Sequence, residues 1–259
     1  MAEKEDIRKG DGGGGKGSLT VVGIGPGGLA HLTRRAEEAL RGADCVVGYT
    51  RYVRLIAPLI EGKETFTTGM THEVERCEKA IELAAGGRKV AVVSSGDAGI
   101  YGMAGLILQL RGDVGVGIEV VPGVPAFVAA SSILGAPLMH DFASISLSDL
   151  LTGWGTIERR VEAAAKADFV VILYNPKSSK RVEGLARALD IVRAHRAATT
   201  PVGVVRNATR EGEEVFLTTL AEVDAYYDRI DMLTIVVVGN SATFSSNGRM
   251  ITPRGYRGV

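Results

Sequence analysis

The sequence predicts an α/β protein built from two α/β domains, and two patterns along the chain support this. Apolar runs with the length of strands alternate with helical patterns from residue 18 onward, which is typical of a mostly parallel sheet with helices on both faces. Two of these runs lead directly into glycine-rich turns, at residues 23–28 and 94–103. Because ligands of open α/β sheets bind beyond the carboxyl ends of the strands, two such turns in one half of the chain suggest one shared ligand cleft.

The first domain is expected at residues 18–138, after a glycine-rich tail at residues 1–17 that has little to bury and is predicted to be disordered. Valine-rich runs bounded by glycine or aspartate predict its strands, at residues 19–24, 45–48, 89–94 and 118–121. Apolar residues spaced three and four apart predict its helices, at residues 33–41, 51–59, 71–85, 101–110 and 125–134.

The segment 134–140, with Gly135 and Pro137, is interpreted as a linker to a second domain at residues 139–259. The same patterns predict strands at residues 143–146, 169–174, 202–206, 214–217 and 233–238, and helices at residues 148–165 and 178–194. Since only short connections separate the last strands, the sheet of this domain is expected to be mixed.

Composition excludes several classes of protein. With 46% hydrophobic and 23% charged residues, the chain has the balance of a soluble globular protein. Its formal net charge of zero favours no nucleic-acid partner, and no apolar run reaches the length of a membrane span. The only cysteines, Cys45 and Cys77, are too far apart for a C-x-x-C metal site and too few for a disulfide framework. We therefore expect no bound metal and a reducing, cytoplasmic location.

The first glycine turn matches G-x-G-x-x-G, a pattern that alone is weak. A dinucleotide site needs a helix that opens on the last glycine and an acidic residue about 20 positions on. Here the helical pattern begins only near Thr33, and the strand at residues 45–48 runs into Tyr49 with no carboxylate at its end. Pro26 also removes a backbone donor from the loop. The turn is therefore either a loop for another ligand or a structural connection.

Three segments resemble motifs of the tetrapyrrole methylases, which are S-adenosylmethionine-dependent enzymes, and they occur in that family's order. They are VGIGPG at residues 22–27, GDAGIYG at 96–102 and VVPGVPA at 120–126. The resemblance extends over residues 18–252 and implies two α/β domains with the cofactor in a cleft between them and a homodimer. Within the family, residues 140–151 and 174–176 resemble the precorrin-3B C-17 methyltransferase branch, which methylates a corrin precursor and contracts its ring in cobalamin synthesis.

The same resemblance implies the residues that contact S-adenosylmethionine and its product S-adenosylhomocysteine. They are Pro26, Ser95, Gly96, Asp97, Ile100, Tyr101, Pro125, Ala126, Asn175 and Ala208. On the residues alone, Asp97 could equally form an Asx turn, and Pro125 with Ala126 could simply begin a helix.

The implied substrate is a macrocycle with many carboxylates, for which arginine is well suited. The candidates at strand ends are Arg206, Arg210 and Lys177, followed by Lys180 and Arg181, although each could be a solvated surface charge. Methyl transfer needs mainly positioning, whereas ring contraction needs a general base.

His140 beside Asp141 is the first candidate for that base, because a carboxylate can orient an imidazole. Asp149 and Ser146 on the same segment are alternatives, and His140 could instead be a linker residue.

Three functions therefore remain open. The first is methylation at C-17 of precorrin-3B or cobalt-factor III, coupled to ring contraction. The second is another activity of the same family, on a protein side chain as in diphthine synthase or on ribosomal RNA. The third is a dinucleotide-binding domain without catalysis. Residues 140–151 favour the first, and the missing carboxylate after residue 48 counts against the third.

Overall fold

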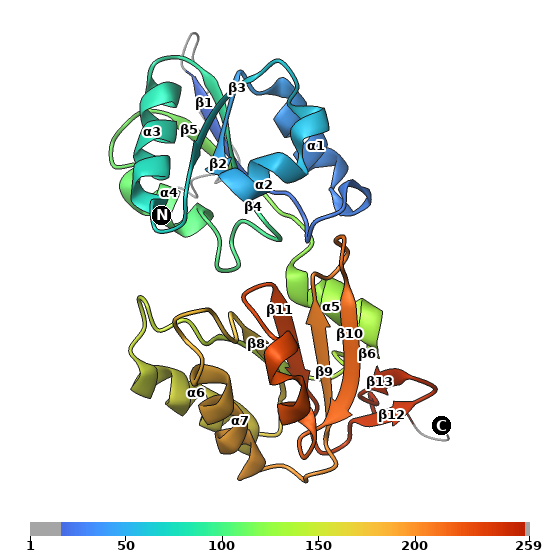
Figure 1. Cartoon of the computed structure of the whole chain (residues 1–259). Coiled ribbons are helices and arrows are strands. Elements are labelled where there is room, and N and C mark those ends of the chain that lie inside the picture. The colour runs from blue at the N-terminus through green and yellow to red at the C-terminus, as the bar shows by residue number, and fades with distance from the viewer. Residues whose placement is uncertain (1–16, 257–259) are drawn as a thin grey trace, which may run out of the picture. The chain divides into compact units, whose positions relative to one another are not determined.

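The computed structural model describes residues 17–256, and the chain divides into two compact units, Met1–Ala126 and Phe127–Val259. Each unit is an α/β structure (Figure 1), so the predicted fold class is confirmed. The tail predicted at residues 1–17 lies, except for Gly17, outside the described residues. The division falls before residue 127 and not near residue 138, because the helix that begins at Ala126 packs on the sheet of the second unit.

The first unit is built on a fully parallel sheet with the strand order β3-β2-β4-β1-β5. Its strands are β1 (Ser18–Gly23), β2 (Cys45–Tyr49), β3 (Glu64–Thr68), β4 (Lys89–Ser94) and β5 (Gly117–Val121). Its helices are α1 (Arg34–Gly42), α2 (Thr50–Leu55), α3 (Glu73–Ala85) and α4 (Ala104–Leu110), with short 3-10 turns at Leu29–His31 and Ala57–Leu59.

Alternation of side chains along the central strands explains why helices cover both faces of this sheet. Leu19 and Val21 of β1 point to one face, where they pack with buried residues of α3 and α4. Val22 points to the other face, where it packs with Leu40 of α1 and Val53 of α2. Figure 1 shows the two helix pairs on opposite sides of the sheet. Burial on both faces is what near-continuous apolar strands predict for a parallel sheet.

The second unit contains the mixed sheet that the sequence predicts, with the strand order β10-β9-β11-β8-β7. Only β7 and β8 are parallel, and the other pairs are antiparallel. The strands are β7 (Phe142–Ser146), β8 (Val170–Tyr174), β9 (Pro201–Arg206), β10 (Glu214–Thr219) and β11 (Thr234–Val238). A small second sheet, with the order β12-β13-β6, is formed by β6 (Gly135–Ala136), β12 (Phe244–Ser246) and β13 (Arg249–Ile251).

Helices also cover both faces of the mixed sheet (Figure 1), and a 3-10 helix spans Val223–Arg229. The helices α6 (Trp154–Lys166) and α7 (Gly184–Arg193) pack on one face through residues such as Ile157 and Leu189. The helix α5 (Ala126–Leu134) packs on the other face. Its Leu134 lies directly on Gly203 of β9, where any Cβ atom would overlap the leucine methyl groups.

Four predicted boundaries are wrong, each for a local reason. The linker at residues 134–140 contains β6, which pairs with β13. The helix expected at 101–110 begins at Ala104, because Tyr101 adopts a left-handed φ of 53°. The helices expected from residues 148 and 178 begin at Trp154 and Gly184, after loops.

Among residues 17–256, no helix is long and apolar enough to cross a membrane. The same described part of the chain holds no group of three histidine, cysteine or carboxylate side chains that could bind a metal ion.

Candidate active site

The glycine turns that follow β1 and β4 are hydrogen-bonded to each other. The N–H of Gly25 donates to the carbonyl oxygen of Gly96 at 3.0 Å, and the N–H of Gly96 donates to that of Gly25 at 2.7 Å. Both glycines have a left-handed backbone, with φ values of 75° and 68°, which other residues adopt only with strain. The two turns therefore form one backbone unit at the carboxyl edge of the sheet.

A third loop, after β5, packs against this unit without intervening side chains. A Cβ atom on Gly23 would lie 2.6 Å from the nitrogen of Gly123, and a Cβ atom on Gly123 would overlap the carbonyl oxygen of Gly96. The strands β4, β1 and β5 are neighbours in the sheet, so their carboxyl ends are adjacent. Glycine at all three positions lets three backbones approach closely at the place where open α/β sheets bind ligands.

The carboxylate of Asp97 connects the second loop to the third. Its Oδ1 accepts the N–H of Gly99 at 2.8 Å, and its Oδ2 accepts the N–H of Gly123 at 3.0 Å. The first bond is the Asx turn that the sequence leaves open, and the second is a contact across loops that the sequence does not reveal. Asp97 therefore fixes the shape of the loops through both of its oxygens.

Other predicted cofactor residues lie on these loops. The turn before α4 is held by Ser94, whose Oγ accepts the N–H of Met103 at 3.0 Å, and it leaves Ile100 and Tyr101 with exposed side chains. Ser95 lies in the same turn, and Pro26 lies in the first loop. The α-hydrogen side of Gly96 faces Pro125 and Ala126, because a Cβ atom there would lie 3.6 Å from the Cα of Pro125 and 3.5 Å from the nitrogen of Ala126.

The first loop does not have the geometry of a dinucleotide site. A 3-10 turn separates it from α1, which begins only at Arg34. The N-cap of α1 is Thr33, whose Oγ1 accepts the N–H of Ala36 at 3.1 Å. Because the N-terminus of the helix does not open on the glycines, it does not face the place where a pyrophosphate would bind.

In the second unit, Ser146 is the last residue of β7, and Asn175 directly follows the parallel strand β8. The Nδ2 of Asn175 donates to the Oγ of Ser146 at 2.9 Å, and the N–H of Ser148 donates to the same oxygen at 3.2 Å. Asn175 has a left-handed φ of 50°, a conformation that asparagine tolerates better than most residues. The two predicted site residues therefore form one hydrogen-bonded pair.

Ala208 is buried in the loop after β9, between Asn207 and Thr209, which both have left-handed φ values. The loop is anchored because the N–H of Asn207 donates to the carbonyl oxygen of Leu233 at 3.0 Å.

Two of the predicted substrate-binding cations are already engaged within the unit. Arg206 pairs with Asp231 at 2.9 Å and with Glu214 at 3.2 Å, and the hydrogen bond to Asp231 raises the pKa of its guanidinium. The Nζ of Lys177 donates to the carbonyl oxygen of Tyr227 at 2.8 Å. Arg210 is half-buried in the loop that contains Ala208.

His140 is not oriented by the carboxylate of Asp141 in the way that the sequence suggests. Its Nδ1 lies 3.7 Å from the carboxylate but accepts the backbone N–H of Asp141 at 2.8 Å. That bond places the proton of a neutral ring on Nε2. To accept a further proton as a base, the ring must give up this bond, because the added proton would occupy Nδ1.

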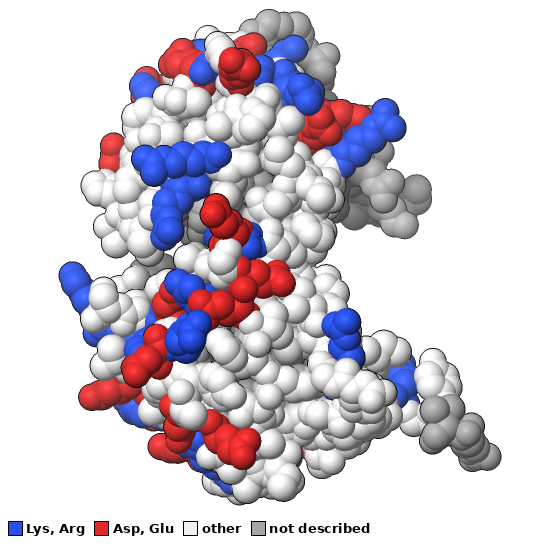
Figure 2. Space-filling view, turned by 45° about the vertical axis from the view of Figure 1, so that its right-hand side comes forward, with Lys and Arg blue, Asp and Glu red and all other residues white. Residues whose placement is uncertain are grey.

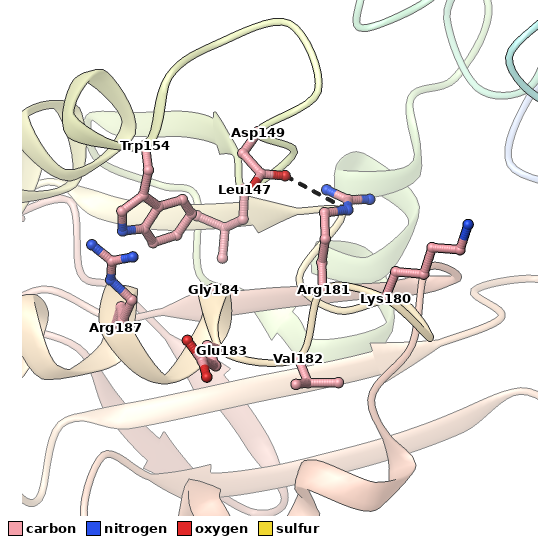
Figure 3. Close-up of a pocket in the computed structure, with 9 residues that line it drawn as sticks. All are labelled: Leu147, Asp149, Trp154, Lys180, Arg181, Val182, Glu183, Gly184 and Arg187. Carbon is pink, nitrogen blue, oxygen red and sulfur yellow. Dashed lines mark ion pairs between the residues drawn. The ribbon is translucent and has the colours of Figure 1, made fainter.

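Asp149 lies in a pocket of about 370 Å³ within the second unit, which the sequence analysis did not identify (Figure 3). Its Oδ1 lies 3.9 Å from the Nε of Arg181. The pocket is also lined by Trp154 and Arg187, from α6 and α7. In the sequence, Arg181 after Asn175-Pro176 is the residue that indicates this pocket. Its pairing with Asp149 depends on the fold.

A comparison with models of protein families identifies one family for this chain. The model of the family described as Tetrapyrrole (Corrin/Porphyrin) Methylases matches residues 18–224, and the chain belongs to this family. Its members are S-adenosylmethionine-dependent methyltransferases.

Relatives that match over more than nine-tenths of the chain have more specific names. A Salmonella typhimurium protein named "Probable cobalt-factor III C(17)-methyltransferase" is 53% identical over 240 residues, which cover 92% of this chain and 99% of that protein. A Priestia megaterium protein named "Cobalt-factor III methyltransferase" is 50% identical over 93% of this chain and 46% of its own length. The crystal structure of the methyltransferase CobJ has a TM-score of 0.86 and 38% sequence identity, and it covers 92% of this chain and 100% of that one.

Proposed function

We propose that this protein transfers a methyl group from S-adenosylmethionine to C-17 of a corrin precursor, precorrin-3B or cobalt-factor III, and couples the transfer to ring contraction in cobalamin biosynthesis. The observation that carries the proposal is the 53% identity to a probable C(17)-methyltransferase over nearly the full length of both chains. A protein or RNA methyltransferase of the same family is the alternative that the experiment below excludes or supports.

The loops of the first unit fit the cofactor. A bound S-adenosylmethionine supplies a methyl group already activated by its sulfonium sulfur, so the protein has mainly to position it. Loops fixed backbone to backbone and by the two bonds of Asp97 meet that demand. We assign the contacts to Pro26, Ser95, Gly96, Asp97, Ile100, Tyr101, Pro125 and Ala126 in the first unit, and to Asn175 and Ala208 in the second.

For the substrate carboxylates we propose Arg206, Arg210 and Lys177. Arg206 would have to give up one of two carboxylate partners, and Lys177 would have to give up a backbone carbonyl. Replacing an existing ion pair by another yields little net binding energy.

The base for ring contraction is proposed among His140, Asp149 and Ser146. If His140 is the base, His140→Ala should slow contraction by about a hundred- to ten-thousandfold and slow methyl transfer much less. A methylated, uncontracted macrocycle would then accumulate and be distinguished from the contracted product by its absorption spectrum. Wild-type rates for both steps would rule His140 out, and Asp149→Asn and Ser146→Ala would be tested next. An equal loss in both steps, with S-adenosylhomocysteine binding intact, would mean that His140 orients the substrate.

The function is tested by incubating the protein with labelled S-adenosylmethionine and either metal-free or cobalt-containing precursor. A gain of one methyl group is expected on one of the two precursors. Label that appears only on a protein or RNA acceptor would contradict the proposal. Calorimetric titration with S-adenosylhomocysteine and with NAD separates a methyltransferase from a dinucleotide-binding domain. Only a methyltransferase is expected to bind S-adenosylhomocysteine.

We further infer a cytoplasmic homodimer with no nucleic-acid or membrane partner. Cys45 and Cys77 are both buried, free thiols, which fits a reducing compartment. On the face drawn in Figure 2, acidic and basic side chains are mixed, which gives a polyanion little to bind. The half-exposed Leu108 of α4 is one apolar side chain that a partner subunit could cover. Light scattering that detects only a 27.3 kDa species at micromolar concentration would contradict the dimer.

A further inference from the structure

The pocket of the second unit lies between two loops that follow β7 and β8. One loop carries Asp149 and leads to Trp154, and the other carries Lys180 and Arg181 and leads to α7 (Figure 3). Both loops leave the carboxyl ends of parallel strands, where α/β sheets bind ligands.

One wall of the pocket is formed by side chains that are paired with one another. The guanidinium of Arg187 lies 4.7 Å from the centre of the Trp154 ring, and its Nη2 donates to the Oε1 of Glu158 at 2.6 Å. Gly184 allows this packing, because a Cβ atom there would lie 3.3 Å from the Cη2 atom of Trp154. The charge of Arg187 is therefore neutralised and fixed, and it forms part of the wall.

Arg181, unlike Arg187, has hydrogen-bond donors that no strong acceptor within residues 17–256 meets. Its side chain is only 19% exposed, and its Nη1 is buried with no hydrogen-bond partner in the described part of the chain. Its Nη2 donates to the sulfur of Met232 at 3.3 Å, a weak acceptor. Its Nε is 3.9 Å from the carboxylate of Asp149, which is beyond hydrogen-bond length. A largely buried guanidinium with unused donors is costly unless a further acceptor completes it.

A carboxylate is the group that best completes Arg181. The planar guanidinium presents paired donors that match the two oxygens of a carboxylate, and such bonds are stronger than neutral ones. Figure 3 places Glu183 away from the Arg181–Asp149 pair, so Asp149 is the anion that an incoming carboxylate must displace or tolerate. Lys180, which is exposed beside the pocket, adds a second positive charge.

We propose that this pocket is a subsite for a carboxylate side arm of the substrate, with Arg181 as its anchor and Asp149 as the competing anion. The proposal rests on the proposed function, which supplies a macrocyclic substrate bearing carboxylates. It adds a residue that determines the affinity and orientation of the macrocycle and that does not lie on the cofactor loops of the first unit.

The pocket offers its own reporter, because Trp154 is the only tryptophan in the chain. Titration of the full-length protein with a polycarboxylated porphyrin should therefore change the Trp154 emission. Arg181→Met should weaken this binding by about ten- to a hundredfold, the loss typical of a charged hydrogen-bonding partner. Arg181→Lys should recover part of it, and Asp149→Asn should tighten binding by removing the competing charge. S-adenosylhomocysteine affinity should stay at its wild-type value in all three variants.

The matched control is Arg159→Met, which removes an arginine from the exposed surface of α6. Melting curves confirm that each variant is folded. In turnover with the corrin precursor, Arg181→Met should raise KM by the same factor with little change in kcat. If porphyrin affinity and KM both stay within twofold of wild type, the subsite proposal is wrong. If the wild-type protein binds the porphyrin through Arg181 but methylates neither precursor, the subsite stands and the proposed function fails.

Discussion

Replacing Asp97 tests whether the loops of the first unit hold one another in place. In Asp97→Asn one amide oxygen can still accept an N–H, but the amide nitrogen then faces the other donor, so one of the two bonds to Gly99 and Gly123 is lost. Hydrogen bonds to charged groups contribute about 1.5–3 kcal/mol. Because Asp97 is partly exposed and water can replace some of this, we expect a loss of about 1–2 kcal/mol for asparagine and about 2–3 kcal/mol for alanine.

The assay combines urea unfolding, followed by circular dichroism, with calorimetric titration of S-adenosylhomocysteine. Because the loop after β5 loses its anchor, the affinity for S-adenosylhomocysteine should fall together with the free energy of unfolding. Both losses should be smaller in Asp97→Asn than in Asp97→Ala. Asp113→Asn, at an exposed turn of the same unit, is the control and should change neither quantity.

Two outcomes would refute this reasoning. Wild-type unfolding and affinity in Asp97→Ala would mean that the two bonds contribute nothing. A large loss of affinity with unchanged unfolding would mean that Asp97 acts only through its proposed contact with the ligand and does not hold the loops.

Two further predictions concern the cores of the two units. Gly203→Ala should destabilise the second unit by about 1–3 kcal/mol, because the new methyl group overlaps Leu134. Gly155→Ala, in a helix where the new Cβ would meet only the Nη1 atom of Arg159 at 3.9 Å, should instead stabilise it by about 0.5–1 kcal/mol. Urea unfolding monitored by Trp154 fluorescence compares the two variants. In the first unit, burial raises the pKa of the Cys77 thiol from 9.0 to about 11. The unfolded state therefore loses this proton first as pH rises, so stability should fall between pH 9 and 11, by at most about 2–3 kcal/mol. Cys77→Ala should show a smaller loss over that range, and an equal loss would contradict the assignment.

The sequence predicted well those elements whose signal is local. Valine-rich strands such as β4 and β11 are apolar on both faces, so their pattern is strong. The strand β3, with the sequence ETFTT, was missed because it lies at the edge of the sheet and is largely exposed. The strands β6, β12 and β13 have only two or three residues and exist through pairing across the chain, which no local pattern reveals.

The candidate site shows the same limit. The glycine turns and Asp97 could be found from the sequence because each follows a recognisable strand. The bond between Asp97 and Gly123 could not, because it depends on β5 lying beside β1 in the sheet. Likewise, Arg206 and Arg181 are both candidate cations in the sequence. Only the fold shows that Arg206 has two carboxylate partners and that a buried donor of Arg181 has none within residues 17–256.

The place of β1 between β4 and β5 constrains how the first unit can assemble during synthesis. The strand leaves the ribosome before the rest of the unit, yet its neighbours in the sheet are β4 and β5, which begin at Lys89 and Gly117. A nascent chain that ends before Lys89 can pair β2 with β3 but offers β1 no partner. Sheet closure must therefore wait for these distant contacts, which are slow to form. An exposed valine-rich strand during that interval is a target for chaperones and a risk for aggregation.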